Sequence, residues 1–97
     1  MYASVRKYVV DQAQMSDLME RVDRDFVSRV EGSPGFAGYH AIDCGRGVLI
    51  TITLGEDRDA VERSMDVAAE FVRDELSDLE IERVEAATGE VGVTRSA

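Results

Sequence analysis

Two short apolar segments, residues 36 to 43 and 48 to 54, flank the glycine-rich sequence Cys44-Gly45-Arg46-Gly47. Glycine accepts the left-handed backbone angles that a tight reversal needs, and β-branched and aromatic residues favour strands. The pattern therefore predicts a β-hairpin near the middle of the chain. Because an isolated hairpin is only marginally stable, the segments before and after it must extend the sheet and cover it.

The register of this hairpin depends on the length of its turn. A two-residue turn at Gly45 and Arg46 gives the following pairs: Cys44 with Gly47, Ile42 with Leu49, His40 with Thr51, and Gly38 with Thr53. A turn that differs by one residue exchanges these partners, because side chains alternate with a period of two. The first register places Ile42, Leu49 and Thr51 on one sheet face, with Tyr39 on the other.

The chain before the hairpin predicts a strand and then a helix. Residues 2 to 10 are rich in valine and tyrosine and contain no turn former, which is typical of a strand. A helix cap at Asp11 or Ser16 follows, and Gly32-Ser33-Pro34-Gly35 ends the helix. Between them, apolar residues recur at the spacing of one helix face: Met15, Leu18, Met19, Val22, Phe26 and Val30.

The chain after the hairpin repeats this order. Gly55-Glu56-Asp57 leads into a second helix, whose acidic first turn suits the helix dipole. Its apolar positions are Val61, Met65, Ala68, Ala69, Val72 and Leu76. After Ser77-Asp78, the alternating residues 79 to 94 predict a last strand preceded by a short extended arm.

The predicted order of strand, helix, strand, strand, helix, strand is the split pattern of the α+β ferredoxin-like fold, in a single domain of residues 1–97. Right-handed crossovers place both helices on one face of an antiparallel sheet. The uncovered face carries Ile42 and Leu49 in the expected register, and a partly apolar face normally acquires a second layer. We therefore expect a homodimer in which two sheets pack face to face.

Composition excludes several classes of protein. The chain has 20 acidic and 11 basic residues and a net charge of -9, which opposes binding to nucleic acid. It has no apolar run near the roughly 18 residues that cross a bilayer, and no basic-then-apolar leader, so we expect a cytoplasmic protein without membrane contact. The single cysteine, Cys44, and single histidine, His40, cannot supply the four ligands of a structural zinc site. We expect no metal and no cofactor.

The segment PGFAGYHAIDCGRGVLITITLG from Pro34 to Gly55, followed by EDRDAVERSMDVAAEFVRDEL and the closing EAATGEVGV, resembles the dimeric α/β-barrel proteins related to antibiotic biosynthesis monooxygenases. The opening MYASVRKY fits their first strand. The resemblance implies two ferredoxin-like subunits joined through their sheets, with any substrate pocket between the sheet and helices of each subunit. Members include cofactor-independent quinone-forming oxygenases and haem-degrading enzymes.

The chain departs from this family at its catalytic residues. The oxygenases and haem degraders use asparagine and tryptophan in the pocket, and this sequence contains neither. By the resemblance, Met65 and Phe71 occupy the corresponding places on the second helix. An apolar residue at each place removes a hydrogen-bonding group, so the oxygenase mechanism does not carry over.

Five residues are candidates for a ligand site: Tyr8, Tyr39, His40, Met65 and Phe71. His40 is the one candidate for a catalytic base, and its alternative is a strand histidine bonded to Thr51. The tyrosines could orient an aromatic ligand or simply fill the core. Two further residues have bland interpretations: Glu90 pairs with Arg6 or Lys7 across the first and last strands, and Cys44 has no basic cluster to activate it.

Two functions remain open. The favoured one is a noncatalytic dimer that binds a small apolar or aromatic ligand or serves as an accessory subunit. The alternative is a cofactor-independent monooxygenase or isomerase that acts on a small aromatic metabolite through Tyr39 and His40. A pocket too small for a bicyclic ring would argue against the enzyme.

The basic residues comprise ten arginines and one lysine, which fits either a salt-rich, halophilic cytoplasm or the codon bias of a GC-rich genome. The charge of -9 doubles to -18 in a dimer, and added salt screens this repulsion as the Debye length falls from about 10 Å at 0.1 M to about 3 Å at 1 M. We predict that the midpoint of thermal unfolding rises as potassium chloride is increased from roughly 0.1 M through 0.5 M to 2 M. A rise that continues into molar salt indicates a salt-rich cytoplasm, and a rise that stops at the middle concentration indicates screening without salt adaptation. A melting temperature that does not change favours codon bias.

Overall fold

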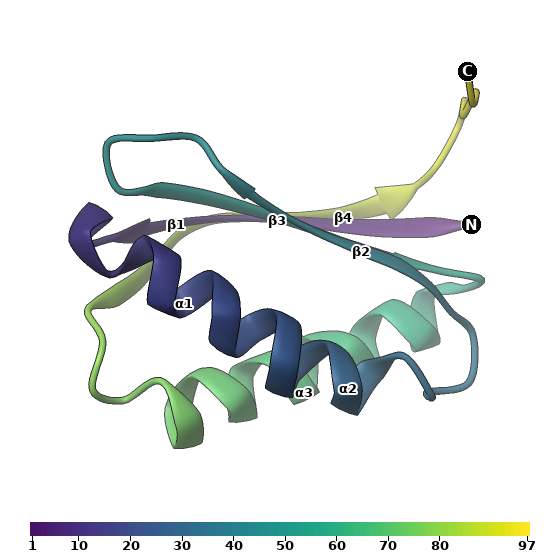
Figure 1. Ribbon diagram of the computed structural model, residues 1–97. Helices are drawn as coiled ribbons and strands as arrows, with labels where there is room; N and C mark the ends of the chain where they lie inside the picture. Colours follow the sequence, from purple (N-terminus) through teal and green to yellow (C-terminus); the bar gives the residue numbers. More distant parts are fainter.

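The computed structural model describes residues 1–97 as one sheet with helices on one side (Figure 1). Its strands are β1 (Tyr2–Val10), β2 (Phe36–Asp43), β3 (Val48–Gly55) and β4 (Ile81–Glu90), in the order β2-β3-β1-β4. Every neighbouring pair is antiparallel. This arrangement confirms the ferredoxin-like fold predicted from the order of the elements.

The first helical segment changes its winding along its length. A 3₁₀ turn (Gln12–Gln14) leads into α1 (Met15–Arg21), a single π turn (Val22–Phe26) and α2 (Val27–Val30). The wide π turn accommodates the four-residue spacing from Val22 through Phe26 to Val30, which exceeds the 3.6 residues of an α-helical turn. All three side chains are buried as a result.

Aspartates cap the start of both helical segments. The side chain of Asp11 accepts a hydrogen bond from the backbone of Ala13, whereas Ser16, the other predicted cap, lies inside α1. The second helix, α3 (Arg58–Glu75), begins after Asp57, whose side chain accepts from the backbone of Ala60 at 2.8 Å. Such caps satisfy backbone donors that have no partner within the helix.

Both helical segments lie on the same face of the sheet, and nothing in the chain covers the other face (Figure 1). The core lies between sheet and helices, and its largest fully buried side chains are Phe26 and Phe71. The residues after β4 run away from the helices toward the uncovered side. Neither helical segment is both long and apolar enough to cross a membrane.

The hairpin between β2 and β3 has a three-residue loop, so the predicted register is wrong by one position. Gly45, Arg46 and Gly47 all have positive φ angles, of 80°, 56° and 75°. The backbone of Cys44 donates to Val48 at 2.9 Å. A side chain on Gly47 would collide with the carbonyl oxygen of Val10, so glycine is required there.

The longer loop exchanges the partners of β2. Ile42 pairs with Ile50 instead of Leu49, and His40 pairs with Ile52 instead of Thr51. As a result, Leu49 and Thr51 face the helices, and Leu49 is only 4% exposed. The expected register placed both residues on the uncovered sheet face. The uncovered face, which we call the open face, carries these apolar residues: Val5, Val9, Ile42, Ile50, Ile52 and Val84.

Three details of the last elements also differ from expectation. Strand β4 ends at Glu90 and does not continue to residue 94. Glu90 lies opposite Tyr2, so its predicted pairing with Arg6 or Lys7 is wrong; Lys7 lies opposite Glu85 instead. In α3, Ala69 is exposed although its spacing suggested the buried face.

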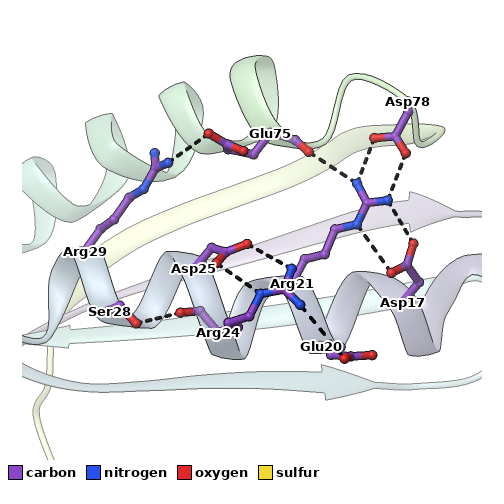
Figure 2. A network of polar contacts seen from close by, with 9 residues as sticks. All are labelled: Asp17, Glu20, Arg21, Arg24, Asp25, Ser28, Arg29, Glu75 and Asp78. Carbon is purple, nitrogen blue, oxygen red and sulfur yellow. Dashed lines mark hydrogen bonds and ion pairs between the residues drawn. The ribbon is translucent and has the colours of Figure 1, made fainter.

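An exposed polar network joins the two helical segments on the side away from the sheet (Figure 2). Arg21 donates to both carboxylate oxygens of Asp78, at 2.8 and 2.9 Å, and also pairs with Asp17. These hydrogen bonds with Arg21 hold the pKa of Asp78 below its usual value. Arg29 pairs with Glu75 at 3.0 Å. The network connects α1 and α2 with the end of α3 and so holds together the helices that cover the core.

Candidate functional site

A cavity lies between the sheet and the helices. It has a volume of about 40 Å³. Because one water molecule needs roughly 10 to 15 Å³, the cavity has room for a few water molecules. Together with its opening to solvent, the space measures about 440 Å³. The helices contribute only apolar residues to its wall, among them Leu18, Val22, Phe26, Ala68, Phe71 and Val72. The sheet contributes all of its polar groups: Arg6, Tyr8, Tyr39, Thr51 and Thr53.

The period of the strands brings these polar groups together. Along β1, alternate residues face the helices, which buries Ser4, Arg6 and Tyr8 in one row. Thr51 of β3 lies directly opposite Arg6. Tyr39 of β2 then reaches the same cavity from the far side of β3. The sheet thus forms a polar floor beneath an apolar roof.

Arg6 is the unusual member of this floor. Its side chain is only 4% exposed, yet it belongs to none of the ion pairs of the chain. Its Nη1 donates to the hydroxyl of Tyr8 at 3.4 Å, which is a long hydrogen bond. Its Nε is buried and has no partner. Burying an unpaired charge costs on the order of several kcal/mol, so Arg6 destabilises the fold unless something in the cavity compensates it.

Tyr39 links this floor to the roof. Its ring lies 5.0 Å from the ring of Phe26, centre to centre, at an angle of 60°. Burial raises the pKa of Tyr39 to about 12, and nearby Tyr8 adds to the rise, while the positive charge of Arg6 lowers it. The hydroxyl therefore stays protonated at neutral pH and can donate a hydrogen bond to a ligand.

The structure brings together three of the five predicted site residues. Tyr8, Tyr39 and Phe71 line the cavity. His40 does not, because it follows Tyr39 directly along β2 and therefore lies exposed on the open face, where it pairs with Ile52 and not with Thr51. Met65 does not line it either, and instead its sulfur accepts from Thr88 of β4 at 3.7 Å.

Sequence reasoning missed Arg6, Thr51 and Thr53 as cavity residues. The signal for Arg6 was present, since it alternates with Ser4 and Tyr8 on one face of β1. The sequence favoured a pairing of Arg6 or Lys7 with Glu90 across the sheet, and charged residues are rarely buried. No group of three or more histidine, cysteine, aspartate or glutamate side chains is placed to hold a metal ion.

Comparison with known proteins rests on structure, since no protein-family model and no curated protein matches the sequence. A monooxygenase of Streptomyces coelicolor, ActVA-Orf6, solved in complex with nanaomycin D, is 20% identical, with a TM-score of 0.69 over 98% of this chain and 92% of that one. The haem degrader MhuD of Mycobacterium tuberculosis, solved with two haems in its active site, is 18% identical. Its TM-score is 0.70, over 99% of this chain and 100% of that one.

A third similar structure is a dimeric ferredoxin-like protein from an uncultured marine organism, 10% identical, with a TM-score of 0.71 over 99% of this chain and 97% of that one. At these identities the likeness shows the fold. It confirms the fold that the family resemblance implies, and the structural neighbours include a monooxygenase, as that resemblance leads one to expect.

The raised pKa of Tyr39 can be observed directly. In an alkaline titration followed by the ultraviolet absorbance of tyrosinate, one of the three tyrosines should ionise near pH 12. Because the unfolded chain loses this proton near pH 10.0, folding stability should hold below that pH and be lost as the pH rises through about 12. Tyr39→Phe should abolish the late step and Tyr2→Phe should keep it. A late step that survives Tyr39→Phe would contradict the assignment.

Proposed function

We propose that this chain forms a homodimer whose subunits each bind a small apolar or aromatic ligand in the cavity between sheet and helices, without catalysis. The observation that carries this proposal is the cavity itself, with an apolar roof and convergent polar groups on its floor. Binding sites are typically concave, mostly apolar and furnished with a few placed polar groups. The same dimer could act as an accessory subunit that delivers or holds such a ligand.

A cofactor-independent monooxygenase or isomerase is the second candidate. In its favour is the structural likeness to a monooxygenase solved with nanaomycin D. Against it, His40 lies outside the cavity and the chain has no asparagine or tryptophan. The cavity of about 40 Å³ is also smaller than the roughly 150 Å³ that accepts a single benzene ring. Any ring must therefore extend into the opening or displace side chains, and a bicyclic ring must do so to a greater extent than a single ring.

The open face supports the homodimer. Val5, Val9, Ile42 and Val84 are each between 41% and 45% exposed there, beside Ile50 and Ile52. Lys7, His40 and Glu85 lie on the same face. Monomeric proteins nevertheless rarely leave large apolar patches in water. A second copy of this chain supplies an identical face, and one structural neighbour is a dimeric ferredoxin-like protein.

The dimer is tested by light scattering. The wild-type protein should have twice the 10.7 kDa mass of the chain at micromolar concentration. Ile52→Glu puts an unpaired carboxylate into the interface, which costs about 3 kcal/mol or more and weakens the dimer by at least about 100-fold. Ala69→Glu, at an exposed position of α3, is the control and should remain dimeric. A wild-type monomer would refute the dimer.

Ligand binding is tested with phenol as the probe. Addition of phenol should shift the nuclear magnetic resonance signals of Tyr8, Tyr39 and Thr51. Ala68→Phe fills the cavity and should weaken this binding at least tenfold, whereas Ala69→Phe makes the same substitution at an exposed neighbouring position and should leave it unchanged. Signals that do not move, or that move equally in both variants, would contradict a binding site in the cavity.

A further inference from the structure

We propose that the ligand of this cavity is a small carboxylate, whose two oxygens pair with the guanidinium of Arg6 while its apolar part lies against the helices. This inference rests on the proposed function and names the class of ligand for the same site.

The first argument is the charge of Arg6. Arginine stays protonated in proteins, so its guanidinium brings a full positive charge into the cavity wall. No aspartate or glutamate lines the cavity. A buried charge is normally paired, and this one has no partner within the chain. An anionic ligand would complete the pair.

The second argument is the unused donor capacity of Arg6. A guanidinium has five N–H donors in a rigid plane, and a carboxylate matches two of them side by side. Here one nitrogen contacts the hydroxyl of Tyr8 at 3.4 Å, and the buried Nε has no acceptor. A neutral ligand with one oxygen would leave more of these donors unpaired than a carboxylate does.

No acidic side chain of this protein is placed to pair with Arg6 in place of a ligand. Across β1 and β4, Arg6 lies opposite Ala86, while Glu85 lies opposite Lys7 and therefore on the other face of the sheet. The carboxylates labelled in Figure 2 pair with arginines of the helices, and none of them lines the cavity. A second copy seated on the open face is separated from Arg6 by the sheet.

The surroundings of Arg6 limit the remainder of the ligand. The hydroxyls of Tyr8, Tyr39 and Thr51 line the same floor and can donate further hydrogen bonds to carboxylate oxygens. Opposite them, Phe26 and Phe71 offer only apolar contact. The small volume favours a short aliphatic chain, or a single ring that extends into the opening, over a fused aromatic system.

The test compares benzoate with benzamide, its uncharged isostere, by calorimetry at constant ionic strength. Wild-type protein should bind benzoate at least tenfold more tightly than benzamide. Arg6→Met removes the charge at similar length and should abolish this preference. Arg6→Lys keeps the charge without the planar fork and should retain part of it. Arg73→Met, which removes an exposed arginine of α3, is the control and should leave both affinities unchanged.

A purely structural role for Arg6 makes different predictions. If Arg6 only supported the fold, Arg6→Met would lower the melting temperature, whereas relief of an unpaired buried charge should leave it equal or higher. Equal binding of benzoate and benzamide, both blocked by Ala68→Phe, would overturn the carboxylate assignment and leave the proposed function standing. Binding of neither probe, nor of phenol, would overturn both. Benzoate binding that survives Ala68→Phe would show surface association only and would also overturn the assignment.

Discussion

The pairing of β1 with both β3 and β4 decides what each face of this protein can do. Because β1 has a hydrogen-bonded neighbour on either side, its backbone is fixed, and its side chains must alternate between two different surroundings. The side facing the helices carries Ser4, Arg6 and Tyr8, and the open face carries Val5 and Val9. One strand thus supplies both the floor of the cavity and part of the proposed dimer interface.

The positions of the elements followed from local sequence, whereas the register did not. Strong local signals, such as the proline and glycines after the first helix and the glycines of the hairpin, marked the ends of the strands and helices to within a few residues. The register depended on a single residue, because Gly47 has a φ of 75° and belongs to the loop, so Cys44 pairs with Val48 and not with Gly47. Its consequence is large: one residue moves Leu49 and Thr51 from the open face to the cavity, while His40, which alternates with Tyr39, stays on the open face.

The sequence predicted only those residues of the candidate site whose type agrees with their position in the alternating pattern. Tyr8, Tyr39 and Phe71 are residues whose type already suggests a half-buried position, so pattern and residue type agreed. Arg6 combines a buried position in the alternating pattern with a residue type that favours the surface, so pattern and residue type pointed to opposite positions. Places where local rules conflict in this way are where functional residues are to be sought, because a sequence selected for stability alone would remove the conflict.

Arg6 also bears on how an acidic protein could bind an acidic ligand. The net charge of -9 repels anions outside the protein, but at physiological ionic strength this repulsion falls off over about 8 Å. Inside the cavity, the low dielectric strengthens the attraction of a single unpaired guanidinium, and no carboxylate lines the wall to weaken it. The two effects act at different distances. Surface charge governs how readily an anion arrives, and Arg6 governs how tightly it is held, so a strongly acidic surface is compatible with a site for carboxylates.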